Sequence, residues 1–181
     1  MIKKTLSLLL ITLGLVHFTG CLAVIGTSST PEISTDRREH EDVLIDQALE
    51  IKIKKLVNSI AEFSSSRVQI HCFNGHVLLL GQTESQDNIH LLSQKISEID
   101  GVKKTYNEIT VEPVIGLWDW ISDRTLSSKI KSSMIVTKGI NPLSIQVFTE
   151  NKVVYLVGIV KEQEEEIAVD IAKNTSGVSK V

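Results

Sequence analysis

The stretch NGHVLLLG at residues 74–81 returns as NKVVYLVG at residues 151–158, so its asparagine and its final glycine both recur 77 positions later. Other pairs follow the same spacing or one residue less: Leu49 with Leu126, Ile53 with Ile130, and Gly101 with Gly177. An internal repeat of this kind predicts two homologous domains of about 70 to 80 residues each.

The segment before the repeat has a different composition. Two lysines precede an apolar run at residues 6–16, and Gly20-Cys21 follows. A run of this length is too short to span a bilayer, and this order is typical of a signal peptide that ends in a lipobox. We therefore expect Cys21 to be acylated, with an ordinary secretory signal as the alternative. Leu22, and not aspartate, follows the cysteine, and the resemblance of this segment to Gram-negative lipoproteins then implies export to the outer membrane.

These features divide the chain into four parts. Residues 1–20 are expected to be the signal peptide, and residues 21–41, rich in serine, threonine and charge, the lipidated cysteine and a flexible tether. The first domain is expected at 42–112 and the second at 113–181.

The first domain has a clear pattern of elements. Apolar residues recur at helical spacing from Ile45 to Ile60, and Val68, Ile70 and Cys72 then alternate as in a strand. Asn74-Gly75 predicts a hairpin, because both residues accept a positive φ. A helix follows, for which Thr83 and Gln86 resemble a capping box, and residues 102–111 are predicted to form a third strand.

The second domain repeats this order. A helix is predicted at about 122–137, strands near 145–147 and 153–157, and a helix at 162–174. Val181 comes before most of the third strand that the first domain has at 103–111. The expected fold class is therefore α+β, with two tandem αββαβ domains, the second lacking most of its last strand.

The pattern resembles the BON domain, in which two helices pack on a short mixed sheet. The resemblance rests on the glycines that end the second strands, Gly81 and Gly158, and on the helix-to-strand corners at Gly101 and Gly177. A lipobox followed by two such domains is similar to the dual-BON outer-membrane lipoproteins. The resemblance implies a non-enzymatic protein that supports outer-membrane integrity and associates with phospholipid. The periplasmic face of that membrane is the default expectation, and no cofactor is expected.

A candidate lipid site lies at the start of the second domain. Both tryptophans of the chain occur in the segment IGLWDWI at residues 115–121, and basic residues follow without an acidic one from 124 to 149. Tryptophan and lysine together favour an anionic phospholipid surface. The expected site residues are Trp118, Trp120, Ile121, Arg124, Lys129 and Lys131. Alternatively, the tryptophans fill the seam between the domains.

Other functions find less support in the sequence. A net charge of −3 gives no general attraction to nucleic acid, and the sequence has no nucleophile elbow, P-loop or HExxH motif. His71 and Cys72 are neighbours in a strand and point to opposite faces, which argues against a shared metal ion. The acidic residues 162–170 are interpreted as a solvated helix face. The remaining alternative is a periplasmic adaptor that binds an envelope protein or peptidoglycan.

Overall fold

The computed structural model describes residues 36–181, which belong to one compact unit. The expected signal peptide, Cys21 and most of the expected tether lie outside the described residues. None of the helices within residues 36–181 is long and apolar enough to cross a membrane.

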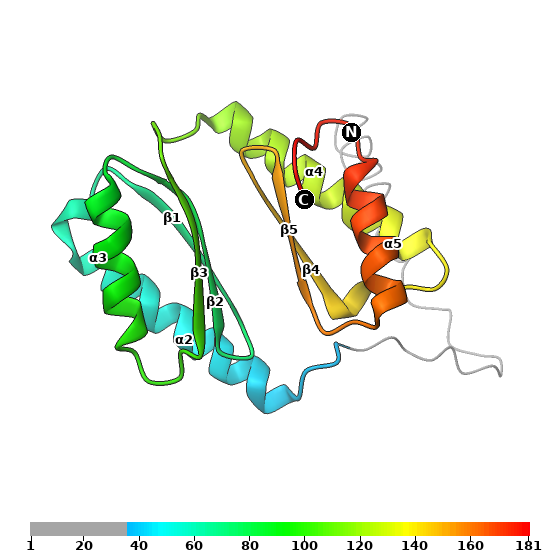
Figure 1. Ribbon diagram of the computed structural model, residues 1–181, viewed down its shortest axis with the longest axis horizontal. Coiled ribbons are helices and arrows are strands. Elements are labelled where there is room, and N and C mark those ends of the chain that lie inside the picture. The colour runs from blue at the N-terminus through cyan, green and yellow to red at the C-terminus, as the bar shows by residue number, and fades with distance from the viewer. Residues whose placement is uncertain (1–35) are drawn as a thin grey trace, which may run out of the picture. The chain divides into compact units, whose positions relative to one another are not determined.

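The first domain contains a three-stranded mixed sheet. Its elements are α2 (His40–Ser59), the short 3-10 helix η2 (Ala61–Phe63), β1 (Arg67–Phe73), β2 (His76–Thr83), α3 (Gln86–Ser97) and β3 (Lys104–Val111). The strand order is β1-β2-β3, with β1 antiparallel and β3 parallel to β2. Both helices lie on one side of this sheet (Figure 1), as the predicted αββαβ order requires.

The second domain repeats this arrangement with a smaller sheet. It contains α4 (Leu117–Val136), η3 (Pro142–Ser144), β4 (Ile145–Glu150), β5 (Val153–Gly158) and α5 (Glu162–Lys173). Strands β4 and β5 are antiparallel, and the predicted third strand is represented by one parallel bridge between Val153 and Lys180. The expectation of two tandem α+β domains is confirmed.

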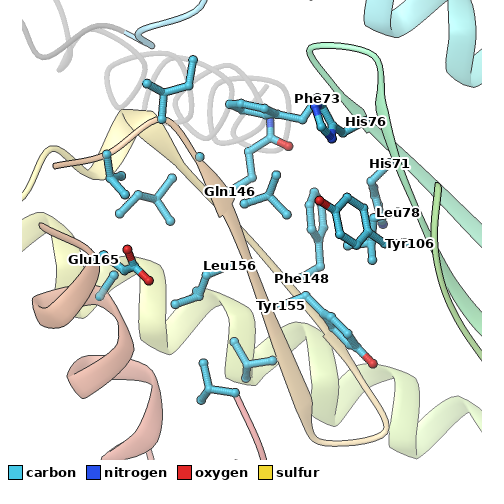
Figure 2. Close-up of a pocket in the computed structure, with 18 of the residues that line it drawn as sticks. His71, Phe73, His76, Leu78, Tyr106, Gln146, Phe148, Tyr155, Leu156 and Glu165 are labelled. Atoms are coloured by element: carbon cyan, nitrogen blue, oxygen red, sulfur yellow. The ribbon is translucent and has the colours of Figure 1, made fainter. Parts of the chain in front are cut away.

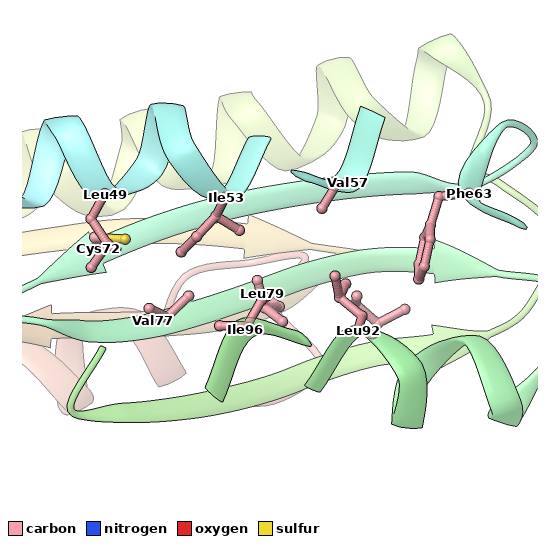
Figure 3. Packing of buried hydrophobic residues seen from close by; sticks show 10 residues of the cluster. Leu49, Ile53, Val57, Phe63, Cys72, Val77, Leu79, Leu92 and Ile96 are labelled. Carbon is pink, nitrogen blue, oxygen red and sulfur yellow. The ribbon is translucent and has the colours of Figure 1, made fainter. Parts of the chain in front are cut away.

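The core of the first domain forms where the helices cover the sheet. Figure 3 shows Leu49, Ile53 and Val57 of α2 above β1, with Ile96 and Leu92 of α3 closing the cluster from the other helix. Because alternate strand residues face one side, Cys72, Val77 and Leu79 enter this cluster, and their neighbours in sequence face away from the helices. The second core has the same layout with smaller side chains from α5, Ala168 and Ala172.

The repeated glycines Gly81 and Gly158 lie where neighbouring backbones come close. A Cβ atom on Gly81 would lie 1.9 Å from the carbonyl oxygen of Arg67, and one on Gly158 would lie 2.2 Å from that of Ser144. Real Cβ atoms do not approach that closely, so any side chain would separate the two strands. The other two repeated glycines, Gly101 and Gly177, have φ angles of 98° and 103° at the helix-to-strand corners.

A second repeated device holds the hairpin turns. Buried Asp46 of α2 accepts hydrogen bonds from the backbone amides of Asn74 at 2.7 Å and Gly75 at 2.9 Å. In the second domain, buried Asp123 of α4 accepts the corresponding two bonds at the same distances. Sequence reasoning missed both residues, although an aspartate on an otherwise apolar helix face that recurs 77 positions later is a readable signal.

Three local expectations need correction. The cap of α3 is Ser85, whose side chain accepts from the amide of Asn88, and not Thr83. Helix α2 begins at His40, within the segment expected to be tether, and Arg38 already bonds to the carboxylates of Asp36 and Asp46. Helix α4 begins at Leu117 instead of Ser122, so both tryptophans lie on the helix.

Candidate functional site

The first turn of α4 has exposed apolar residues and no side-chain cap. Gly116 precedes it without a side-chain cap, and the amide of Trp120 donates to the carbonyl of Gly116 at 3.1 Å. The sequence did not predict this turn, because its large apolar residues do not follow the spacing of a packed helix face. These side chains are not packed against a core, and so the first turn lacks the three- and four-residue spacing of apolar residues by which a helix is recognised.

Five large apolar side chains between the end of β3 and the second turn of α4 are exposed. We call them the apolar tip: Val111 (47% exposed), Val114 (45%), Leu117 (66%), Trp118 (81%) and Ile121 (38%). Large exposed apolar residues that gather in this way are typical of interaction surfaces, and this segment is therefore the candidate site. Of the predicted site residues, Trp118 and Ile121 belong to this tip, and Leu117 was missed by sequence reasoning.

The two tryptophans have different surroundings. Trp118 is exposed, whereas Trp120 is half-buried and has the guanidinium of Arg124 over its ring, 4.8 Å from the ring centroid. This cation–π contact holds the cation of Arg124 next to the first turn of the helix. The structure thus brings Trp120 and Arg124 together beside the tip.

The two predicted lysines also differ. Lys129 is exposed, and the structure shows no ion pair for it within residues 36–181. Lys131 is half-buried, and its ammonium donates to the carbonyl oxygens of Pro142 and Ile145. Burial lowers the pKa of Lys131, and the charge of Asp36 opposes that shift. Lys131 therefore joins α4 to η3 and to the first residue of β4, and does not point freely to solvent.

The acidic helix α5 is not a uniformly solvated face, which corrects the sequence interpretation. Glu164 is 7% exposed and forms a two-bonded ion pair with Arg37, at 2.5 and 2.8 Å. The hydrogen bond from Arg37 is the main reason that the pKa of Glu164 falls to about 2. The other acidic residues of the first turn, Glu162 and Glu165, are exposed as expected.

The faces of the two sheets that point away from the helices contact each other through polar and aromatic groups. His71 of β1 stacks on Phe148 of β4 with ring centroids 3.7 Å apart, and burial lowers the pKa of His71 to about 4. Glu150 of β4 accepts hydrogen bonds from the side chains of Arg67, Gln69 and Gln82. The first domain therefore supplies all three donors to one buried carboxylate of the second.

Beside the His71–Phe148 stack lies a cavity of about 840 Å³. Figure 2 shows Tyr106 and Phe148 near His71, with Tyr155 further along β5. The lining is mainly aromatic and aliphatic, and burial raises the pKa of Tyr155 to about 12 and that of Cys72 likewise to about 12. Neither group supplies an ionised nucleophile near neutral pH. Within residues 36–181, no three potential metal-ligating side chains converge.

Comparison with known proteins adds a family match. The family model described as "BON domain" matches residues 45–113 and 122–181. The chain is similar to the outer membrane lipoprotein DolP of Haemophilus influenzae, with 33% identity over 165 residues that cover 90% of this chain and 86% of that protein. It is also similar to a 21 kDa hemolysin of Actinobacillus pleuropneumoniae, with 28% identity over 75% of this chain and 71% of the relative. Among solved structures, the C-terminal domain of the Chlamydia trachomatis type III secretion protein CdsD aligns at 13% identity with a TM-score of 0.30, over 75% of this chain and 63% of that one.

Proposed function

Because this chain belongs to the BON-domain family, among the outer-membrane lipoproteins of the DolP type, we propose that it supports the envelope by binding anionic phospholipid through the apolar tip of its second domain. The protein is a non-enzymatic outer-membrane lipoprotein. Beyond this family assignment, we propose that the chain binds a lipid surface, that the apolar tip contacts it, and that the contact is on the periplasmic face.

One observation carries the proposal, which is that Trp118 is 81% exposed among other exposed apolar residues. Tryptophan favours the boundary between headgroups and acyl chains, because its ring is apolar while its N–H keeps a polar partner. If about 100 Å² of the ring leaves water, the transfer contributes about 2.5 kcal/mol. The cations of Arg124 and Lys129 would add about 1 kcal/mol each near an anionic surface.

The site is also within reach of a membrane to which Cys21 is attached. Asp36 is close enough to Lys131 for their charges to interact, and Trp118 lies 13 residues before Lys131 on the same helix, or about 20 Å along its axis. The chain from Cys21 to Asp36 has a contour length of about 50 Å. An anchored protein could therefore place the apolar tip on the surface that holds its own lipid.

The test uses the full-length protein reconstituted in liposomes that contain either brominated phosphatidylglycerol or brominated phosphatidylcholine. Bromine quenches tryptophan fluorescence only at contact range, and both tryptophans of the chain are in the proposed site. We expect quenching that is strong with phosphatidylglycerol, weak with phosphatidylcholine, and reduced by salt.

Matched variants of exposed residues separate the apolar and the charged contributions. Trp118→Ser should lower the affinity of a soluble form for phosphatidylglycerol vesicles roughly 50-fold, while Val136→Ser, an 82% exposed site at the other end of α4, should change it less than about twofold. Lys129→Gln should weaken binding about fivefold. Tryptophans that are not quenched by either lipid would refute the proposal and favour an adaptor that binds a protein partner.

A further inference from the structure

Helix α4, which carries Leu117, Trp118 and Ile121 of the apolar tip, is connected to β3 of the first domain by a linker, residues 112–116, whose backbone is held at the domain seam. The amide of Ile115, three residues before Trp118, donates to the side-chain oxygen of Gln82 at 3.3 Å. Glu112 accepts a longer bond of 3.4 Å from the side chain of Asn151, in the hairpin turn of the second domain. The direction in which the chain enters α4 thus depends on groups that do not belong to α4.

Gln82 lies at the centre of this connection. It is on β2, between Arg67 of β1 and Thr110 of β3 in the sheet register, and it is 1% exposed. Its side-chain nitrogen donates to Glu150 at 2.6 Å, while its oxygen accepts from Ile115. A carboxylate can only accept, so Glu150 fixes which end of the Gln82 amide is the donor. The same orientation presents the oxygen to the linker.

Glu150 is itself held firmly. It is 5% exposed, and besides Gln82 it accepts from the guanidinium of Arg67 and the amide of Gln69, both on β1. Hydrogen bonds to an ionised acceptor are about twice as strong as those between neutral groups. A carboxylate with three donors therefore has one well-defined position. Through its hydrogen bond it fixes the side chain of Gln82, and Gln82 in turn fixes the amide of Ile115.

We infer that Gln82 and Glu150 are positioning residues for the lipid site, because their hydrogen-bonded chain fixes the linker and so presents the apolar tip for insertion. The inference rests on the proposed function of the tip. It assigns part of the lipid affinity of the second domain to a side chain of the first, although neither residue is in the tip.

For Glu150→Gln, electrostatics and the loss of linker positioning predict opposite changes in lipid binding. Glu150→Gln removes one negative charge, so electrostatics alone would strengthen binding to an anionic surface. The substitution, however, replaces one carboxylate oxygen with an NH2 donor, so residue 150 can no longer accept from Arg67, Gln69 and Gln82 together. Residue 150 then no longer fixes the orientation of Gln82, and the linker becomes free to move. We therefore expect weaker lipid contact from a protein that is less negative. Glu166→Gln, an exposed site on α5, is the charge-matched control.

Gln69 provides a control for the amide. Gln69 and Gln82 both donate to Glu150, but only Gln82 also bonds to the linker. Gln82→Met and Gln69→Met remove one donor each from the same carboxylate with little change in side-chain volume. If the two residues act only by stabilising the seam, the two variants should behave alike.

The experiment measures two quantities on the full-length protein. Hydrogen exchange of the amides from Ile115 to Trp118, measured without lipid, reports the position of the linker. Tryptophan quenching in brominated phosphatidylglycerol liposomes reports lipid contact. For Gln82→Met and Glu150→Gln we expect exchange about fivefold faster and contact about fivefold weaker, the size of one net hydrogen bond, with Gln69→Met and Glu166→Gln within about twofold of the wild type.

The outcomes separate the inference from the proposed function. Unchanged exchange in Gln82→Met, or an equal effect of Gln69→Met, would overturn the inference even if the wild-type tryptophans are quenched. Faster exchange with unchanged quenching would also overturn it, because the linker would then not control the tip. Absence of quenching in the wild type refutes the proposed function, and with it any role of Gln82 in lipid binding.

Discussion

The repeated aspartates allow one domain to serve as a control for the other. Asp46 and Asp123 are 2% and 3% exposed, and each accepts two turn amides at 2.7 and 2.9 Å. Asp46 differs in one respect, since its carboxylate also pairs with the guanidinium of Arg38 at 3.1 Å. Replacing each aspartate by alanine should therefore remove the same two bonds, plus an ion pair in the first domain alone.

The magnitudes follow from these partners. A hydrogen bond to a charged group contributes about 1.5 kcal/mol or more, so Asp123→Ala should lower the free energy of unfolding by about 3 kcal/mol. Asp46→Ala should cost about 4 to 5 kcal/mol, because Arg38, whose side chain is 6% exposed, keeps Asp36 but loses its buried partner. The difference of about 1 to 2 kcal/mol is the contribution of the ion pair to the first domain.

Urea unfolding followed by far-UV circular dichroism measures both changes, since both domains contribute helix to the signal. Tryptophan fluorescence provides an independent signal from the second domain, because Trp118 and Trp120 are on α4. Asp170→Ala on the exposed side of α5 is the control and should stay within about 0.5 kcal/mol. If both variants lost less than about 1 kcal/mol, or if Asp123→Ala were the more damaging, the assignment of the aspartates as turn caps would be wrong.

Three further predictions concern other local features. Gly158→Ala should lower the unfolding free energy by more than about 2 kcal/mol, because its Cβ would meet the Ser144 carbonyl at 2.2 Å, whereas Gly116→Ala, with no atom nearer than 3.6 Å, should cost less than half as much in the same urea assay. Lys152→Gly should stabilise by about 1 kcal/mol in thermal unfolding, because Lys152 has a φ of 64° in the hairpin turn, and a loss of stability would contradict this account. The folded-state pKa of His71 is lowered to about 4 from 6.5, so its neutral form favours folding. Its contribution is present above about pH 6.5 and is lost as the pH falls towards 4, and His71→Phe should flatten the unfolding free energy over that window, which urea titrations at several pH values would show.

The sequence predicts the parts of the fold that depend on local pattern. Alternation and helical spacing identified both hairpins and most helix positions, because burial on one face imposes a period on the residues. The start of α4 was missed for the same reason, since the side chains of Leu117 and Trp118 are exposed and obey no packing period. The cap of α3 was placed two residues early, because Thr83 and Ser85 are both chemically capable of capping and the backbone geometry decides between them.

The candidate site was predictable in composition but not in its supporting contacts. Tryptophans next to basic residues are visible in a sequence, and Trp118 and Arg124 were found in that way. Gln82 donates to Glu150, 68 positions away, and accepts from the amide of Ile115, 33 positions away, and no local pattern indicates either bond. The sequence shows that Lys131 and Glu164 are charged, but it does not show their partners. In the structure Lys131 bonds to backbone carbonyls and Glu164 pairs with Arg37, so both residues stabilise the fold.

The repeat also explains why the proposed lipid site is in one domain and not in the other. Helices α2 and α4 both contain 20 residues, begin 77 positions apart, and hold their hairpins with equivalent aspartates. Their exposed first turns differ in chemistry, because His40 and Glu41 occupy the positions of Leu117 and Trp118.

An exposed glutamate at the position of Trp118 adds no apolar area and is repelled by an anionic surface. The first domain therefore has the same scaffold without the residues that we propose to contact lipid. The first domain contributes instead through its sheet, where Arg67, Gln69 and Gln82 surround Glu150. Duplication has therefore produced two versions of one fold, in which the second presents the apolar tip and the first holds the linker that leads to it.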